Sequence, residues 1–222
     1  MSRKSGKRRP QQSRRPAPSR PQRPGHRRVP APAQQPPRQP ASNPGLILLA
    51  GFCAALLLFW YYHLLVLNQL TGLSAGLAMP DQLIGGFDAA HVQALRAAMD
   101  ADAAGQLNYV HKTAGVLFTL FLASATLLAV ALHVRRRVLR WVLFAVPLGF
   151  AVVRLWGQAA IDALLHPEAA GSPVDAGDVA LASALTVAGW VLLFGTVALA
   201  AAVVLASLAR SFRRKHTEAG ID

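Results

Sequence analysis

Four apolar runs of about 20 residues or more divide the chain, and the gaps between them alternate in charge. A run of this length matches the roughly 30 Å of hydrocarbon that a membrane helix must cross. Basic residues gather in three gaps: 20 of the 23 Lys and Arg lie in residues 1–44, 135–140 and 210–215. The other two gaps hold eight of the ten acids, at Asp81, Asp88, Asp100, Asp102, Asp162, Glu168, Asp175 and Asp178. Because Lys and Arg near short loops stay in the cytoplasm, this alternation predicts four membrane crossings with both termini inside.

The pattern predicts an all-α membrane protein: a four-transmembrane-helix antiparallel bundle with a short extracytoplasmic helix and a disordered basic N-terminal tail. The first run is too long for a signal peptide, whose apolar region has about 7–15 residues, so we expect a retained helix. The expected domains are a tail at 1–44, a transmembrane domain at 45–208 and a basic C-terminal tail at 209–222, with spans at about 45–67, 109–133, 141–161 and 181–205 and outer loops at 68–108 and 162–178.

Residues 1–44 contain eleven prolines and twelve basic residues, with no acidic and no aromatic residue. A segment with so little apolar surface cannot offset its chain entropy, so we expect it to be disordered. Its charge suits contact with the anionic lipids of the inner leaflet, through residues that include Arg8, Arg9, Arg14, Arg15, Arg27 and Arg28. Because no aromatic side chain could stack on bases, nucleic acid is not the expected partner.

The first outer loop is expected to contain a short helix over residues 89–103. Asp88 is a suitable N-cap, the following residues are good helix formers, and Gly105 suits the C-terminal end. Val92, Leu95 and Met99 recur at helical spacing and predict one apolar face. Because that face is narrow and the helix has few basic residues, we expect it to pack against the bundle.

Arg154 is a charged residue inside the third apolar run, about seven residues before its end. At 1.5 Å per residue it lies roughly 10 Å inside the interface. Its side chain tilts toward the helix N-terminus, away from the nearer interface. Because a charge at such depth costs a few kcal/mol unless it is paired, we expect Arg154 to face the bundle interior and to have a partner.

Two interpretations of this region remain open. His63, His111 and Gln158 are expected at a similar depth, so these residues and Arg154 form a candidate ligand site for an anion or lipid headgroup, or a proton relay. The structural alternative is a clamp in which a carboxylate joins the outer loop to the bundle. Asp162 and Asp88 are the candidate clamp partners.

Cofactor and metal sites have weak support in the sequence. His63 and His111 on neighbouring helices could ligate a b-type haem, which is kept as an alternative although no cofactor is expected. Cys53 is the only cysteine, which excludes an intramolecular disulfide, and we expect it to be a small buried residue. The acids of the 68–108 loop lack the spacing of a calcium-binding loop, so we expect solvated charges and no metal site.

The segment Gly86-Phe87-Asp88-Ala89-Ala90-His91, with Gly105 and Tyr109 further on, resembles the first outer loop of a group of small uncharacterised bacterial four-helix integral membrane proteins. In that group a Gly-aromatic-Asp/Ser cap, a short helix and a Gly-x-x-x-Tyr precede the second span. The group often has an acidic residue and Asn late in its third span, where this chain has Arg154 and Gln158. The resemblance implies the topology and gives no activity.

These observations predict a multi-pass protein of the bacterial plasma membrane with cytoplasmic termini. No catalytic motif is present, so the expected function is non-enzymatic: a scaffold or an accessory subunit of a larger assembly. Its expected partners are the lipid bilayer and other membrane proteins or a second copy of the chain. The alternative is a ligand-, proton- or electron-handling membrane protein that uses Arg154, His63 and His111.

Overall fold

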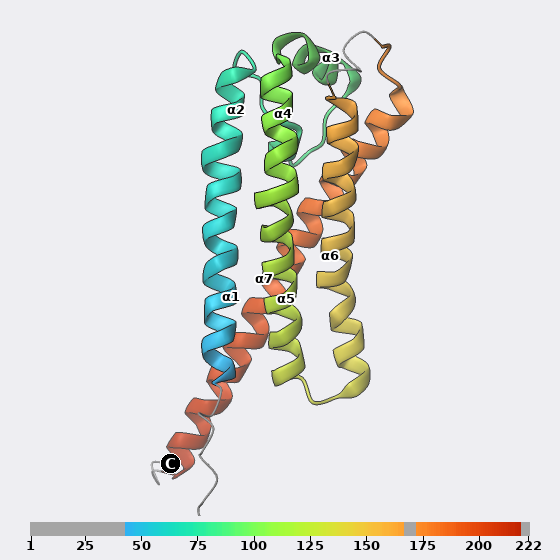
Figure 1. The fold of residues 1–222 in the computed structure, drawn as a ribbon. Helices are drawn as coiled ribbons and strands as arrows, with labels where there is room; N and C mark the ends of the chain where they lie inside the picture. The colour runs from blue at the N-terminus through green and yellow to red at the C-terminus, as the bar shows by residue number, and fades with distance from the viewer. Residues whose placement is uncertain (1–42, 167–171, 219–222) are drawn as a thin grey trace, which may run out of the picture. The chain divides into compact units, whose positions relative to one another are not determined.

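Four long apolar helices dominate the computed structural model, which describes residues 43–166 and 172–218 (Figure 1). Each is long and apolar enough to cross a membrane, and the part of the chain described contains no strand. The four spans are Pro44–Leu73, Ala101–His133, Arg137–Leu164 and Ala176–Arg210. The predicted all-helical fold with four spans is therefore confirmed, and the chain is a multi-pass membrane protein by helix length and hydropathy. The predicted disordered tail lies outside the described residues.

The first span is built from three helical segments in series. These are α1 (Pro44–Phe59), the π-helical segment η1 (Trp60–Val66) and α2 (Leu67–Leu73). Asn43 caps the start, because its side chain accepts a hydrogen bond from the Gly45 amide, and Pro44 suits the first helical turn. A π-helical turn inserts an extra residue and changes the direction of the side chains around it, and η1 contains Tyr62 and His63.

The second span comprises α4 (Ala101–Val110), the π-helical segment η3 (His111–Gly115) and α5 (Val116–His133). The prediction of one short helix over residues 89–103 was wrong, because the second span already begins at Ala101. The chain instead forms α3 (Ala89–Ala98), breaks, and starts α4 where Asp100 caps the Ala103 amide. Gly105 consequently lies inside α4 and does not end a helix. The break follows from a second N-cap, since Asp100 favours a helix start over helix continuation.

The third and fourth spans are α6 (Arg137–Leu164) and the first part of α7 (Ala176–Glu218). A turn of three residues, 134–136, joins α5 to α6 and makes them antiparallel neighbours (Figure 1). Helix α6 packs against α5 and α7, and α1 packs against α5. We call the end of the bundle at residues 134–136 the turn end, and the opposite end, which carries residues 74–100, the loop end.

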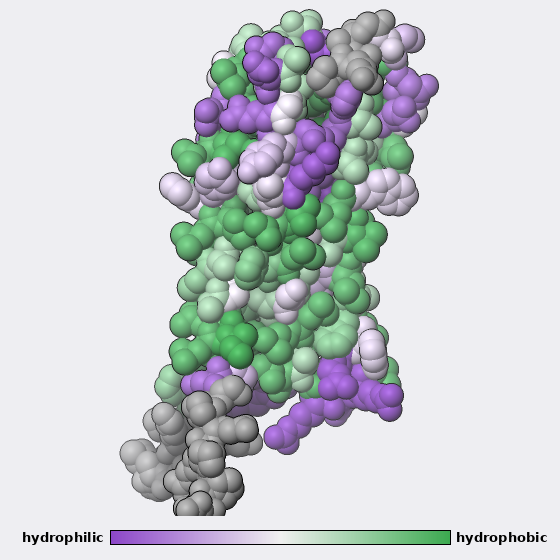
Figure 2. Space-filling model, viewed as in Figure 1, coloured by the Kyte–Doolittle hydropathy of each residue, from purple (hydrophilic) through white to green (hydrophobic). Residues whose placement is uncertain are grey.

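The outer surface of the spans is apolar, as a lipid environment requires. Figure 2 shows a band of hydrophobic residues across this face, with hydrophilic residues gathered above and below it. Large apolar side chains that are at least half exposed include Leu46, Leu57, Val142, Val152 and Val191. Exposed Trp and Tyr side chains include Trp60, Tyr109 and Trp156, in the halves of their spans nearer the loop end, and Trp141, near the turn end. Trp and Tyr favour the membrane–water interface, and their exposure on the spans is consistent with contact with lipid.

Residues 74–100 form a cap on the loop end of the bundle. Asp88 caps α3 as predicted, with its carboxylate 2.8 Å from the His91 amide. Val92 and Leu95 on the predicted apolar face are almost fully buried in the core of the loop end, which confirms packing against the bundle. Arg96 donates to the carbonyl oxygens of Leu164 and Ser172, at 2.7 and 3.1 Å, and so ties α3 to the end of α6.

Buried threonines do not link the helices to one another. Thr119, Thr126, Thr186 and Thr196 each donate to the carbonyl oxygen four residues earlier in the same helix. Their hydroxyl groups are therefore satisfied locally, as is common for Thr inside membrane helices. Helix–helix contact in the middle of the bundle accordingly depends on side-chain packing.

Candidate functional site

Asp81 lies at the centre of a buried polar cluster at the loop end. It belongs to the short 3-10 helix η2 (Pro80–Gln82) of the cap, and its side chain is fully buried. The expectation of a solvated loop charge was wrong for this residue. Its backbone carbonyl accepts a hydrogen bond from the Trp190 indole at 3.1 Å, which anchors η2 to α7. The cap therefore inserts a carboxylate between the helices.

Arg154 on α6 is buried and has the partner that the sequence argument required. Its guanidinium lies 3.1 Å from a carboxylate oxygen of Asp81 and donates to Nε2 of His63 at the same distance. It also lies over the Tyr62 ring, 5.7 Å from the centroid, where the aromatic face attracts a cation. The structure thus joins the outer loop to the bundle through Asp81, and Arg154 forms no ion pair with either candidate clamp partner, Asp162 or Asp88, among the described residues.

Each of those candidates has another contact. Asp162 accepts a hydrogen bond from Nδ1 of His111 at 2.5 Å, and Asp88 caps α3. The second ring nitrogen of His111 lies 2.9 Å from Asp81. We call Asp81, His111, Arg154 and Asp162 the buried ion cluster.

The two carboxylates define the protonation state of His111. Carboxylates only accept hydrogen bonds, whereas a neutral imidazole has a single N–H to donate. When both aspartates are ionised, the two contacts of His111 require the doubly protonated ring. The buried ion cluster then contains two negative charges and two positive charges, and it is neutral overall. Charge balance of this kind is what permits ionised groups to remain buried.

The pKa of the Asp81 carboxyl lies well below its ordinary value of 3.8. Burial alone raises that pKa, because it disfavours the charged form, but the charges of His111 and Arg154 and the hydrogen bond from His111 outweigh it. Asp81 is therefore a carboxylate at physiological pH.

His63 and Gln158 lie beside the buried ion cluster. Because Arg154 can only donate, the Nε2 atom of His63 accepts and the ring is neutral. His63 is otherwise enclosed by aromatic rings, stacked on Phe59 at 4.5 Å and edge-on to Trp190 at 5.4 Å. Gln158 donates a long hydrogen bond of 3.4 Å to the Tyr62 hydroxyl.

Both π-helical segments supply side chains to this region. Segment η1 positions Tyr62 and His63, and η3 positions His111. Such bulges re-aim side chains inside otherwise regular helices and are frequent at functional sites. Gly115, at the end of η3, allows close approach to α6, since a Cβ there would collide with the Gln158 amide.

The arrangement does not fit the b-type haem alternative. Both nitrogens of His111 are occupied by carboxylates, and Nε2 of His63 faces a guanidinium. An iron atom at His111 would have to displace an ion pair, and one at Nε2 of His63 would have to displace the Arg154 guanidinium. Among the described residues there is also no group of three or more His, Cys, Asp or Glu placed to hold a metal ion. Cys53, which we expected to be buried, is exposed.

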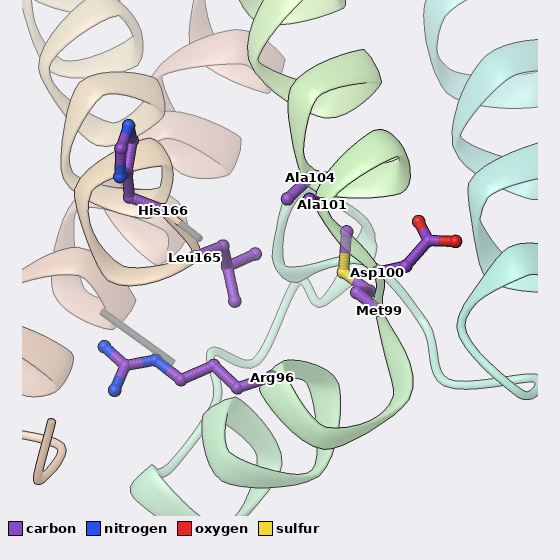
Figure 3. Close-up of a pocket in the computed structure, with 7 residues that line it drawn as sticks. All are labelled: Arg96, Met99, Asp100, Ala101, Ala104, Leu165 and His166. Atoms are coloured by element: carbon purple, nitrogen blue, oxygen red, sulfur yellow. The ribbon is translucent and has the colours of Figure 1, made fainter. Parts of the chain in front are cut away.

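Four cavities are described, and none is lined by Arg154, His63, His111 or Gln158. Two adjacent hollows open near the loop end. One, of about 230 Å³, is lined by Arg96, Met99, Asp100, Ala101, Ala104, Leu165 and His166 (Figure 3). The other, of about 160 Å³, shares Ala104, Leu165 and His166 with the first and is bordered by Asp162.

Sequence reasoning missed three residues of this region: Asp81, Tyr62 and Trp190. A signal for Asp81 was available, because it follows the apolar residues Leu77, Ala78 and Met79, which is unusual for a solvated loop. Tyr62 and Trp190 had no such signal, since both are typical interface residues. The predicted membrane-surface residues Arg8 to Arg28 lie outside the described part of the chain.

No protein-family model matches this chain, and comparisons with curated proteins and with solved structures found no match either.

Proposed function

We propose that the chain is a non-enzymatic protein of the bacterial plasma membrane, a scaffold or accessory subunit that presents its loop-end cap to a partner. The observation that carries the proposal is the closed state of the buried ion cluster. Its charged groups contact one another, and both Arg154 and His111 form ion pairs with Asp81. Arg154, His63 and His111 line none of the four cavities described above, which supports a structural role for the cluster.

A closed ion cluster is suited to holding a loop in one position. Removing one member of a buried pair leaves an uncompensated charge, which costs about 3–5 kcal/mol. Movement of η2 out of the bundle has the same consequence, because it separates Asp81 from both of its partners. The cap is therefore a rigid surface, and a rigid surface loses little entropy when a partner binds it.

The cap presents mixed chemistry to a partner. Ile84 of the cap and Leu73 at the end of α2 are about half exposed, and the cavity in Figure 3 adds Arg96 and Asp100 at its walls. A mixture of exposed apolar and charged residues is typical of a contact surface between proteins. The proposed partner is another membrane protein or a second copy of this chain. The resemblance to small bacterial four-helix membrane proteins supports the same topology.

The proposed orientation places the cap outside and both termini in the cytoplasm. It rests on Arg135, Arg136, Arg137 and Arg140, which follow the second span directly. Basic residues next to a membrane helix are retained on the cytoplasmic side.

Native assembly size and site-specific crosslinking test this function. A photo-crosslinking residue at Ile84 should capture one discrete protein in intact membranes, and the native particle should be larger than one 23.6 kDa chain. The matched control is the same residue at Val152, which is similarly exposed but lies on the apolar face of α6 and should capture lipid. A monomeric particle with equal crosslinks at both positions would contradict the proposal.

Proton handling is the second candidate function. It is favoured by Asp162, whose side chain is 12% exposed, borders a hollow near the surface and contacts His111. Asp162, His111, Asp81, Arg154 and His63 form one row of hydrogen bonds and ion pairs from that hollow into the bundle. Proton flux into liposomes that contain the protein tests this function. Asp162→Asn should abolish the flux and Asp178→Asn should not; no flux above empty liposomes excludes the function.

A further inference from the structure

The turn end of the bundle contains a cavity of about 670 Å³ between α5, α6 and α7, far from the buried ion cluster. Its wall is apolar and includes Leu139, Leu143, Leu199 and Val203. Its rim is cationic and is formed by Arg135, Arg136 and Arg210, next to His133. The cavity thus combines an apolar wall with a positively charged border.

The rim arginines are not neutralised by nearby acids. Among the described residues, the only carboxylates in ion pairs are Asp81 and Asp162, and both lie at the loop end. Three basic side chains therefore surround one opening without a counter-charge from the described chain. An anion of small size would relieve their mutual repulsion.

Arg210 is held at the rim in a defined position. Its Nε donates to the Ala206 carbonyl at 3.1 Å, and its two terminal nitrogens lie 3.4 and 3.5 Å from the His133 carbonyl. A guanidinium has five N–H donors, so two are left for a further acceptor. The first turn of α6 adds backbone donors at the same place, because Arg136 supplies no side-chain cap.

We propose that this cavity binds an anionic phospholipid, with its phosphate among Arg135, Arg136 and Arg210 and an acyl chain along the apolar wall. Both halves of the ligand are specified by the site: the rim selects negative charge, and the wall selects a hydrocarbon chain. Basic pockets between membrane helices are suited to anionic headgroups in this way. A second copy of the chain is disfavoured, because it would bring the same cationic rim against this one. Inorganic phosphate has no group for the apolar wall.

Photo-crosslinking with a defined lipid tests the site. The full-length protein is reconstituted in phosphatidylcholine vesicles that contain a trace of phosphatidylglycerol with a photoactivatable acyl chain, and the labelled peptides are mapped by mass spectrometry. Label is expected on residues 139–143 and 199–206. Unlabelled phosphatidylglycerol should compete, whereas phosphatidylcholine and inorganic phosphate should not.

A matched pair of charge variants separates this site from general attraction to a basic protein. Arg135→Gln/Arg136→Gln removes two rim charges, and Arg137→Gln/Arg140→Gln removes the same charge from neighbours that do not line the cavity. Labelling should fall about fivefold or more in the first variant and stay near wild type in the second. Ala206→Leu, which narrows the cavity without changing charge, should also reduce labelling.

Three results would overturn the proposal. The first is label spread evenly over the lipid-facing helices. The second is equal labelling by a photoactivatable phosphatidylcholine. The third is an equal loss in both charge variants when circular dichroism shows intact helices.

Discussion

The guanidinium of Arg154 and the carboxylate of Asp81, 3.1 Å apart, connect a membrane helix to the loop that joins the first two spans. Neither residue is exposed by more than a few per cent. The ion pair fixes the position of the loop relative to the interior of the bundle. In turn, the loop supplies the negative charge that compensates Arg154, the one arginine that is buried within a span in the described part of the chain.

The first prediction concerns this pair. Asp81→Asn or Arg154→Leu alone should lower the free energy of unfolding by about 3 kcal/mol or more, because each leaves an unpaired buried charge. The double variant should lose less than the sum of the two single variants, because it removes both charges. Unfolding in detergent, followed by circular dichroism, measures all three. The control is Asp178→Asn, an exposed acid that should change stability by less than about 0.5 kcal/mol. Additive losses would show that the two residues act independently.

The second prediction is a pH dependence with a defined sign. The pKa of Asp81 is depressed on folding. Its contribution to the free energy of unfolding is therefore fully present above the unfolded pKa of 3.8, and that contribution is lost as the pH falls from 3.8 toward the folded pKa. Between pH 8 and pH 5, Asp81 should not change how the free energy of unfolding varies with pH. Below about pH 4, the free energy of unfolding of the wild type should fall more steeply than that of Asp81→Asn, by up to about 1.4 kcal/mol per pH unit. Parallel curves for the two proteins in acid would contradict the assignment.

The third prediction concerns the turn before α3. Gly86 has φ of +85°, and a Cβ there would collide with the Ser183 hydroxyl, which accepts a hydrogen bond from the Phe87 amide. Gly86→Ala should therefore destabilise the cap by about 1–3 kcal/mol. Gly85→Ala is the matched control, since no atom lies within 4 Å of its Cβ position and its φ is not positive. Limited proteolysis of the cap measures both. Equal protease sensitivity of the two variants would refute the strain argument.

The fourth prediction tests the orientation. Cys53 is the only cysteine, so Cys53→Ser provides a cysteine-free background for single labels at Gln93 in the cap and Arg136 in the turn. A membrane-impermeant maleimide should label Gln93→Cys in intact cells and Arg136→Cys only after lysis, because arginines next to a span stay inside. The reverse pattern would place the cap in the cytoplasm and would remove the proposed contact with outer partners.

Much of the fold was predictable because lipid imposes a simple rule on sequence. A span must be a long apolar helix, so the four runs identify the four spans directly. The structure extends them, and the second span begins at Ala101, eight residues before its predicted start at 109. The polar residues of α4 concealed this extension, because a helix that projects beyond the membrane needs no apolar surface there.

The candidate site was less predictable, for a geometric reason. The sequence argument required Arg154 to be buried and to have a partner, and the structure shows both. The choice of Asp81 over Asp88 or Asp162 depends on how η2 folds into the bundle, which helical periodicity does not specify. The contact of Asp162 with His111 likewise depends on η3, whose π-helical turn has no simple sequence signature.

The locally satisfied threonines have a mechanical consequence. Because their hydroxyls bond within their own helices, side-chain hydrogen bonds between spans in the described chain are concentrated at the loop end, and the turn end has only the long contact of Arg210 with the His133 carbonyl. Cohesion of the spans at the turn end therefore depends on apolar packing, in which Leu48, Ala129 and Val203 are buried, and on the three-residue turn between α5 and α6. At the loop end the polar contacts around Asp81 add to such packing.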